Sequence, residues 1–587
     1  MKTKLLLLSG VVMMLVGCSC SNTDTSKVEL YEKDTIVRKD LYFLDPDNGN
    51  VTSELALDVL YRAEKEEPYI SMDNAAQVLD LFRKAKGGSS LNVKVENNGN
   101  KSTLKNENGA TAVVDGESQT ITFADMDKFL IPTSQPTLYM YTIPSGVKSV
   151  KVSNSSFEKG KQVVIDLKKY SQISIINYSG KNYLPVQTFS DLFLSIIEGN
   201  NIAYNMHDLY LLTDVSTLET NALGLKGLTS LGKKFFNGPK LETVSSHYSE
   251  FFYQSLLLNY DNGYGLKTKK NINSFDEFFS NKGYKNDLIS GNVKTMDASL
   301  AYGLSTLRDA HTAFTANSPL YDYGTMKVDQ NQFDKQYRQY IVDGEEFAKE
   351  KTKQGIKEGL EIDQTNGIAY ISFNNFTEIN EQALYSLSSL SNKDIVENTQ
   401  TLFAQAYKTI TSSANKDKVK YVVVDLTSND GGFASSLLYG LGTLIGDINT
   451  YMMNGLSESH SAVSYKVDIN ADGKIDNNDK SLSELGYKIC FLDSRFSFSS
   501  GNAMPILAKQ NNSNVVLLGQ KTGGGTCSVR LSNTAIGSSF NQSSVATIVT
   551  KNGSTYSDVE EGINPDVEIE ESKLTDRAYV ASVLGRD

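Results

Sequence analysis

The chain has 587 residues, which is too long for one hydrophobic core, so we expect two to four domains. Its formal net charge is −12, and no cluster of lysine and arginine interleaved with aromatic residues occurs, which argues against a nucleic-acid partner. The sequence contains no CxxC or HxxxH spacing, which argues against a zinc site.

The N-terminal residues are typical of a targeting signal. Two lysines precede an apolar run over residues 5–16, and Cys18 follows a small residue. This pattern resembles a bacterial lipoprotein signal, in which residues 1–17 are removed and Cys18 becomes the lipidated N-terminus. It predicts a protein on the extracytoplasmic face of the cell membrane, anchored through that lipid, with residues 18–27 as a tether. The other cysteines are Cys20, Cys490 and Cys527. Because their number is odd, we expect no disulfide framework.

Residues 28–215 alternate short strand patterns with two amphipathic stretches, EPYISMDNAAQVLDLF and KNYLPVQTFSDLFLSI. Each stretch is typical of a strand, a turn and a helix. The second resembles a small module found at the start of copper amine oxidases and in many cell-wall proteins. We expect a non-catalytic α+β accessory domain, which either binds substrate or serves as packing scaffold.

The remaining chain divides into three parts. Residues 216–318, which include His311, repeat apolar side chains every three or four positions and predict a helical subdomain. Residues 319–360 are polar and weakly patterned, and we expect a loop or arm there. Over residues 361–587 apolar strand runs alternate with helical stretches, which predicts an α/β domain.

Three apolar strand runs in this last part each end in a polar, glycine-rich corner. They read KYVVVDLTSNDGG, CFLDSRFSFSSGNAMPILA and NVVLLGQKTGGGTCSV. In an open α/β sheet, reacting groups collect in the crevice beyond the carboxyl ends of the strands. Ser499 lies in the middle corner at a sharp strand-to-helix turn, which makes it the candidate nucleophile.

A serine nucleophile needs a proton acceptor and donors for the oxyanion. The first corner offers Gly431 and Gly432, because without side chains their backbone N–H groups can approach a reacting carbonyl. The N–H of Ser500 would be a second donor. In isolation Asn-Asp-Gly-Gly is typical of a tight turn, but this turn follows a strand that we expect to neighbour the one leading to Ser499.

An ordered set of motifs resembles a known family. LRDAHT, VVVDLTSNDGG, FSFSSGNA, LLGQKTGGG and EEGINPDVEI are similar to the tail-specific, or C-terminal-processing, serine peptidases, and within them to the branch related to the tricorn protease core. The resemblance covers residues 240–587. It implies a mixed-sheet α/β peptidase core of the ClpP and crotonase type, a polypeptide substrate and no required cofactor.

The resemblance also implies roles for single residues. Ser499 would be the acyl-forming nucleophile and His311 the general base, while Gly431 or Gly432 together with Ser500 would supply the oxyanion donors. The tricorn-like branch uses an acidic residue late in the chain. Three candidates precede GINPD: Asp558, Glu560 and Glu561. We select Glu560.

The sequence departs from the family pattern in three places. The Ser/Lys branch has a lysine after its GE-x-T turn, where this chain has Gly523–Gly525; Lys521 comes before the turn, so we expect no Ser/Lys dyad. Ala310 stands where the tricorn core has a serine. Between His311 and Gly367 the chain is too short for a PDZ domain of about 80 to 90 residues.

A second pattern lies before the Ser499 strand. It places oxygen ligands at positions 1, 3, 5, 9 and 12 of a loop, with glycine at 6 and a backbone carbonyl at 7, as in EF-hand calcium loops. The candidate calcium ligands are Asp468, Asn470, Asp472, Lys474, Asp476 and Asp479. An Asp/Asn-rich hairpin loop without metal is the alternative. A bound ion would stiffen the loop rather than take part in catalysis.

Two functions follow from these patterns. The first is a membrane-anchored, extracytoplasmic serine endopeptidase that works through an acyl-enzyme on Ser499. The second is a surface-binding lipoprotein that keeps the peptidase fold without its activity, which the missing lysine and Ala310 favour.

Overall fold

The computed structural model describes residues 28, 30–45, 49–85, 90–131, 146–196, 199–213, 228–321 and 329–585. The predicted signal, Cys18 and the tether lie outside these ranges. Within the described ranges, no helix is both long and apolar enough to cross a membrane.

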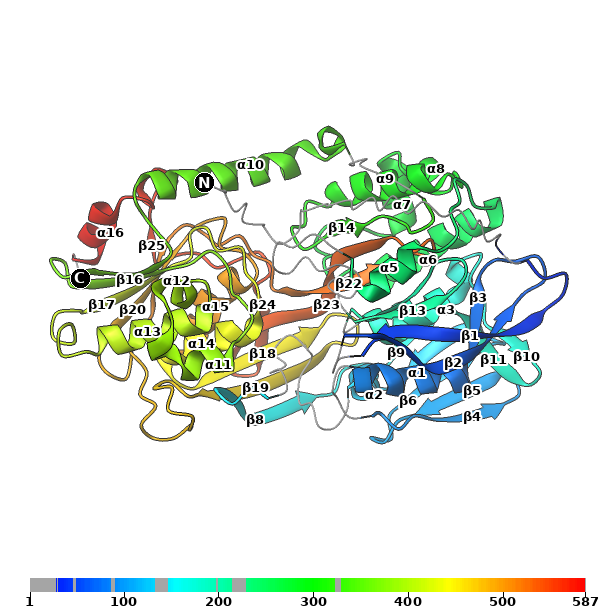
Figure 1. Cartoon of the computed structure of the whole chain (residues 1–587), viewed down its shortest axis with the longest axis horizontal. Helices are drawn as coiled ribbons and strands as arrows, with labels where there is room; N and C mark the ends of the chain where they lie inside the picture. The colour runs from blue at the N-terminus through cyan, green and yellow to red at the C-terminus, as the bar shows by residue number, and fades with distance from the viewer. Residues whose placement is uncertain are drawn as a thin grey trace.

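Two sheets form the N-terminal region, which is drawn in blue and cyan at the right of Figure 1. The larger sheet has the order β10-β11-β3-β2-β1-β13-β12. Its strands are β1 (Thr35–Leu44), β2 (Val51–Tyr61), β3 (Pro68–Ser71), β10 (Ile176–Tyr178), β11 (Lys181–Pro185), β12 (Asn201–Tyr204) and β13 (Leu209–Leu212). The smaller, antiparallel sheet contains β4 (Lys94–Asn98), β5 (Lys101–Lys105), β6 (Thr111–Asp115), β7 (Thr120–Phe123) and β9 (Val163–Asp166).

Both strand–helix repeats predicted in this region are present. β3 leads into α1 (Met72–Ala85), and β11 leads into α3 (Val186–Phe189), which continues as a π-helix over Ser190–Ser195. The predicted turn between strand and helix is absent, because each helix begins at the residue after its strand. A short helix, α2 (Met126–Leu130), begins at Asp125, whose carboxylate accepts the N–H of Lys128.

The described part of the predicted helical region, residues 228–318, is helical up to Ser305 and ends in the strand β14 (Ala313–Ala316). It contains α5 (Ser230–Phe236), α6 (Ser246–Gly263), α7 (Phe275–Asn281), α8 (Lys285–Leu288) and α9 (Val293–Ser305). Side chains of Thr229, Ser245, Ser274 and Asn292 each accept a backbone N–H at the start of a helix. One continuous apolar core joins these helices to both N-terminal sheets, so the two regions stabilise each other.

The sheet that carries the candidate site has the order β15-β16-β17-β20-β21-β25 and is parallel from β16 to β25. Its strands are β15 (Gly359–Asp363), β16 (Ile368–Ser372), β17 (Tyr421–Asp425), β20 (Lys488–Asp493), β21 (Val516–Gly519) and β25 (Val567–Glu568). Alternate strand residues face opposite sides. Val422 and Val424 pack in the core with α13 (Thr399–Ile410), α14 (Ala434–Ile445) and α15 (Ser500–Asn511), whereas Val423 packs in the core with α16 (Arg577–Leu584). This is the predicted α/β architecture.

A third large sheet joins all parts of the chain. Its order is β14-β23-β18-β19-β8, and β22 and β24 also pair with β23. The strands are β8 (Val150–Glu158), β14 (Ala313–Ala316), β18 (Ile448–Asn454), β19 (Ser459–Val467), β22 (Cys527–Asn533), β23 (Ser539–Asn552) and β24 (Thr555–Asp558). β8 comes from the N-terminal region and β14 from the helical region, so the long strand β23 connects the two halves of the molecule (Figure 1).

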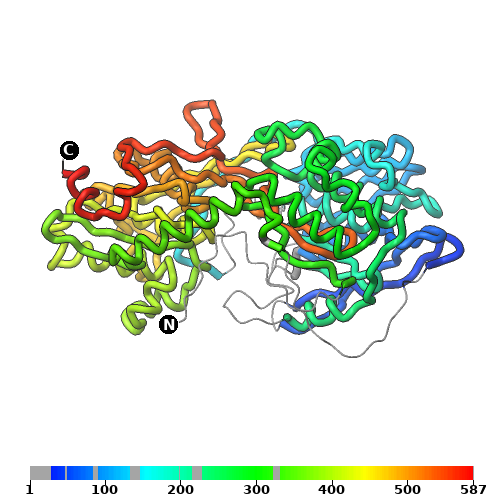
Figure 2. Tube along the Cα trace, turned by 90° about the horizontal axis from the view of Figure 1, so that it is seen from above, coloured from blue at the N-terminus to red at the C-terminus, as the bar shows by residue number. Residues whose placement is uncertain are grey.

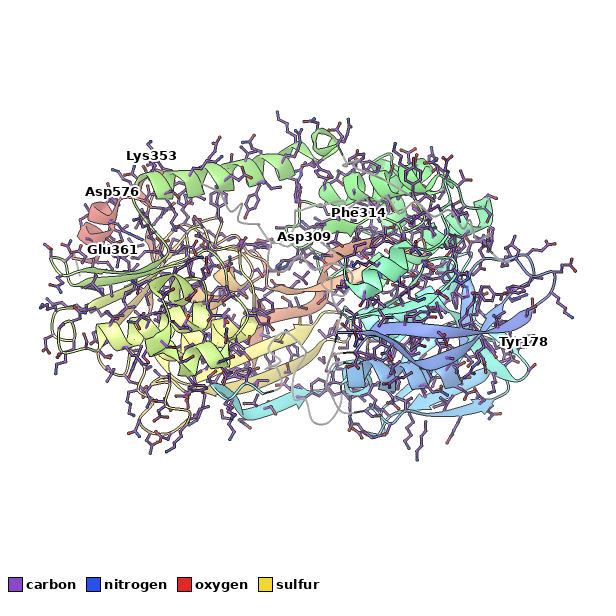
Figure 3. All side chains as sticks on the ribbon, in the orientation of Figure 1. Tyr178, Asp309, Phe314, Lys353, Glu361 and Asp576 are labelled. Carbon is purple, nitrogen blue, oxygen red and sulfur yellow. The ribbon has the colours of Figure 1, made fainter. Side chains whose placement is uncertain are left out.

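The predicted loop or arm at residues 319–360 contains a long helix instead, α10 (Lys335–Lys353). Figures 1 and 2 show α10 extending from the helical region to the six-stranded sheet, and Lys353 at its end lies on the side of the molecule opposite Tyr178 (Figure 3). The sequence analysis missed this helix because few of its side chains are apolar. Phe347 packs against Phe496, with ring centroids 5.7 Å apart.

A buried ion pair also fixes α10. Lys351 Nζ lies 3.1 Å from Asp425 Oδ1, at the end of β17, and Arg577 of α16 donates to the other oxygen of the same carboxylate at 2.8 Å. Burial alone raises the pKa of Asp425, but these two cations lower it well below its usual range, so the carboxylate is charged. The pairing attaches two helices to the edge of the sheet where the candidate site lies.

Candidate active site

The three glycine-rich corners meet at one edge of the six-stranded sheet. β17, β20 and β21 are parallel neighbours, so their carboxyl ends lie side by side. The N–H of Phe498 donates to the carbonyl of Asn429 in the first corner, and the N–H of Ser499 donates to the carbonyl of Gly524 in the third, both at 2.9 Å. The expected adjacency of the corners is therefore present.

Ser499 occupies a strained turn. Its backbone has φ 55° and ψ −122°, and α15 begins at the next residue. A positive φ is uncommon for a residue with a side chain and is found at functional turns, including the strand-to-helix turn that exposes a nucleophile. The Ser499 side chain is half-buried and makes no capping hydrogen bond to α15.

Only glycine fits at the two positions of the first corner. Gly431 has φ 104°, and a Cβ atom there would lie 2.5 Å from Ser499 Cβ. Gly432 has φ 128°, and a Cβ atom there would lie 2.1 Å from the carbonyl oxygen of Phe376. The corner therefore contacts Ser499 directly, at a distance that leaves no room for a side chain on Gly431.

The two glycines differ in what their N–H groups do. The N–H of Gly431 donates to Asn429 Oδ1 at 3.0 Å, so it is already used. No hydrogen bond is formed by the N–H of Gly432 or of Ser500 to any residue that the structure describes. Of the predicted donors, Gly432 and Ser500 are thus the pair available to an oxyanion, and Gly431 serves as the close contact to Ser499.

His311 lies in the turn between α9 and β14 and is buried. Its ring centroid is 4.7 Å from that of Phe498, the residue before Ser499. Neither ring nitrogen forms a hydrogen bond within the described residues, so the structure does not link His311 to Ser499 by one. Burial lowers the pKa of His311, while the charges of Asp309 and Glu560 act in the opposite direction. The imidazole is therefore neutral at neutral pH and able to accept a proton.

The three acidic candidates lie in different surroundings. Asp558 pairs with Lys269, and Glu561 is exposed. Glu560 is buried, and its Oε2 accepts hydrogen bonds from the N–H of Thr526 at 2.6 Å and the N–H of Cys527 at 2.8 Å. It is also the member of the three whose charge acts on His311. These contacts favour Glu560 over the other two.

Two further carboxyl groups at the site were not selected from the sequence. Asp309, near the centre of Figure 3, accepts the N–H of His311 at 3.1 Å and the hydroxyl of Thr312 at 2.6 Å, which fixes the turn that holds the histidine. Asp309 is the first residue of the DAHT motif that contains His311, so the sequence could have indicated it. Asp430 precedes Gly431, and burial raises its pKa to about 8. Nothing in the sequence indicates that burial.

The third corner packs against Ser499 as a turn. The N–H of Gly525 donates to the carbonyl of Glu560 at 3.0 Å, and a Cβ atom on Gly525 would lie 2.5 Å from the Phe498 ring. Lys521 is exposed, which agrees with the expectation of no Ser/Lys dyad.

The carboxylates of the predicted calcium loop accept hydrogen bonds from the loop's own backbone. Asp468 accepts the N–H groups of Asp472 and Gly473, and Asp479 accepts those of Ile469 and Asp476, so the carboxylates face the loop's own backbone. In the part of the chain that the structure describes, no three His, Cys, Asp or Glu side chains gather to hold a metal. Calcium binding stays a prediction from the pattern.

Comparisons with known proteins agree with the sheet and its corners. Residues 367–569 match the model of peptidase family S41. A search of curated proteins finds no match to this chain.

Three solved structures are similar to this chain. The photosystem II D1 C-terminal processing protease is 18% identical, and the match covers 37% of this chain and 46% of that one with a TM-score of 0.27. A lipoprotein from Streptococcus agalactiae is 13% identical (57% of this chain, 96% of that one, TM-score 0.33), and the tricorn protease is 11% identical (94% of this chain, 62% of that one, TM-score 0.29). The chain spans less than half the length of the D1 processing protease. The family match confirms the family that the sequence resembles, over residues 367–569: this part of the chain matches peptidase family S41, a family of serine peptidases.

Proposed function

We propose that the protein is a membrane-anchored, extracytoplasmic serine endopeptidase that hydrolyses polypeptides through an acyl-enzyme on Ser499. The observation that carries the proposal is the strained turn that holds Ser499 against Gly431, beside the uncommitted N–H groups of Gly432 and Ser500. Such a turn has a cost of about 1–3 kcal/mol, and strained turns of this kind cluster at functional sites.

The reaction follows from these positions. Ser499 Oγ attacks the peptide carbonyl carbon while His311 accepts the hydroxyl proton, and the N–H groups of Gly432 and Ser500 bind the oxyanion. The carbon–nitrogen bond then breaks, and the imidazolium returns its proton to the leaving amine. Water, deprotonated by His311, then attacks the acyl carbon. The ester carbon–oxygen bond breaks, and the imidazolium returns its proton to Ser499 Oγ as the second product leaves.

The surroundings of His311 support its role as the base. Burial keeps the ring neutral before reaction, and both ring nitrogens are uncommitted within the described residues. Because no hydrogen bond joins His311 to Ser499, the proposal requires the two side chains to close on each other when substrate binds, as catalytic hydrogen bonds often do. Glu560, fixed by the backbone of β22, would stabilise the imidazolium through its charge.

The location rests on the sequence pattern that ends at Cys18, which predicts a lipid anchor outside the cytoplasm. The peptidase domain and the location are independent parts of the proposal and are tested separately.

Digestion of denatured protein pools, read by mass spectrometry, tests the activity. We expect new internal cleavage products with the wild-type chain and none with Ser499→Ala. Lys521→Ala is the matched control, because a Ser/Lys enzyme would lose activity with that lysine, whereas the exposed Lys521 is not required by the Ser/His chemistry. A folded wild-type chain that cleaves nothing would favour the alternative, a surface-binding lipoprotein.

A further inference from the structure

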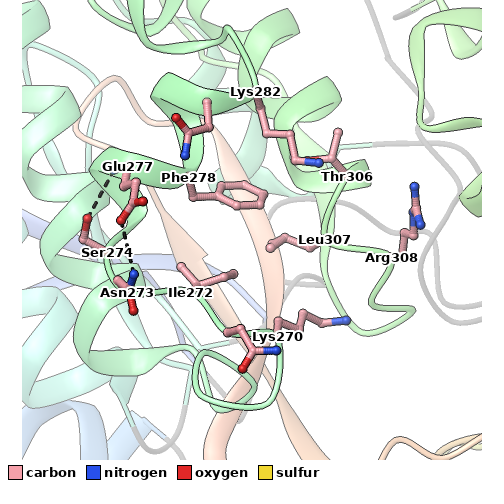
Figure 4. Close-up of a pocket in the computed structure, with 12 residues that line it drawn as sticks. Lys270, Ile272, Asn273, Ser274, Glu277, Phe278, Lys282, Thr306, Leu307 and Arg308 are labelled. Atoms are coloured by element: carbon pink, nitrogen blue, oxygen red, sulfur yellow. Dashed lines mark hydrogen bonds between the residues drawn. The ribbon is translucent and has the colours of Figure 1, made fainter.

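A pocket of about 410 Å³ lies in the helical region, close in the chain to His311. Its walls come from residues 270–274 before α7, from α7 itself and from residues 306–308 after α9 (Figure 4). This volume is within the range of small-molecule and side-chain binding sites.

The pocket combines an apolar floor with cationic side chains. Ile272, Phe278 and Leu307 form the floor, and Figure 4 shows Lys270 and Lys282 on opposite sides of Leu307. An occupant would therefore place an apolar group on the floor and an anionic group within reach of the lysines.

These two lysines differ from their neighbours. Nearby lysines are paired with carboxylates: Lys267 with Asp261 at 2.8 Å and Lys285 with Asp276 at 2.7 Å. Lys270 and Lys282 form no ion pair with any described residue, although the chain as a whole has a net charge of −12. In an acidic protein, two unpaired lysines on one pocket form a local site for anions.

The other charged groups of the pocket leave a positive balance. Arg308 is neutralised by Asp334, with Nε 2.9 Å from Oδ1. Glu277 also lines the pocket and offsets one lysine, while its carboxylate accepts a hydrogen bond from Asn273 at 3.4 Å. One positive charge remains, which suits a single carboxylate better than a doubly charged phosphate.

Two parts of the pocket lining are close in the chain to residues of the candidate active site. Leu307 and Arg308 lead directly to the turn that holds His311, and Lys269, next to Lys270, pairs with Asp558 just before Glu560. We propose that this pocket binds an acidic side chain adjacent to an apolar side chain of the polypeptide substrate, as an anchoring site beyond the scissile bond. The inference rests on the proposed peptidase function.

Fluorescence anisotropy with the full chain carrying Ser499→Ala tests the inference without cleavage. The probe is a labelled peptide, blocked at both ends, with a glutamate beside a leucine; its partner has glutamine instead. We expect the glutamate peptide to bind more tightly, and the double variant Lys270→Ala, Lys282→Ala to weaken it about 3- to 10-fold, more at low salt than at high salt. The matched control removes two remote, exposed lysines of α10: Lys349→Ala with Lys353→Ala.

Equal affinity for the two peptides would overturn the inference, and so would an equal loss in the control variant, because the effect would then reflect overall charge. The binding assay needs no catalysis, so it separates the two proposals. Selective binding together with a wild-type chain that cleaves nothing would support the pocket and contradict the peptidase function. Cleavage by the wild-type chain without selective binding would contradict the pocket and support the peptidase function.

Discussion

Replacing Gly431 with alanine tests the contact between the first corner and Ser499. The added Cβ atom would lie 2.5 Å from Ser499 Cβ and 3.0 Å from both Ser499 Oγ and the carbonyl oxygen of Phe498. Ordinary contacts begin at 3.4 Å, so the two segments must separate by about 1 Å. The residue that moves is the one we propose as the nucleophile.

The expected loss follows from this displacement. A shift of about 1 Å in a reacting group costs about 100-fold in rate. The positive φ of 104° adds backbone strain of about 1–3 kcal/mol, which lowers stability without altering the site. Gly486→Ala isolates that second effect, because Gly486 has φ 94° and no atom within 4 Å of an added Cβ.

The assay is the rate of labelling by a fluorophosphonate probe, with thermal melting of each variant measured alongside. We expect both alanine variants to melt at lower temperature than the wild type, and Gly431→Ala alone to label about 100-fold more slowly. Labelling of folded Gly431→Ala at the wild-type rate would refute the reasoning, because the corner would then not set the position of Ser499.

Three further predictions concern the base, the calcium loop and the anchor. Because burial lowers the pKa of His311, its neutral form persists below pH 6.5, the ordinary pKa of histidine. We therefore expect the acid limb of the kcat/KM profile to lie below pH 6.5. An acid limb above pH 6.5 would contradict the role of His311 as the base. If Asp468–Asp479 binds calcium, added calcium raises the melting temperature and Asp472→Ala abolishes the rise; an unchanged wild-type melt counts against binding. Cys18→Ser should move the protein from the membrane to the soluble fraction of cells and abolish palmitate labelling, and unaltered fractionation would rule out the anchor.

The sequence was most informative where burial is continuous. The parallel strands of residues 361–587 read as unbroken apolar runs because both faces of the sheet are covered, and this also located the corners that follow them. The α10 helix was missed because its few buried side chains, such as Phe347, lie among many charged ones. Its position depends on the pairing of Lys351 with Asp425, a contact distant in sequence.

The site could be predicted in outline only. Residue types and their order indicated Ser499, His311 and the glycine corner. Which glycine has a free N–H depends on the side chain of Asn429, and which acid acts on His311 depends on how β24 and β22 place Glu560. Such details arise from packing between segments far apart in the chain, which no local pattern records.

The central claim is that Ser499 is a nucleophile activated by His311. Mass spectrometry of the chain after fluorophosphonate treatment, followed by mapping of the modified peptide, measures this directly. We predict a single adduct on Ser499 that is absent in Ser499→Ala and strongly slowed in folded His311→Ala. An adduct on another residue, or unmodified Ser499 in folded wild-type protein, would contradict the claim.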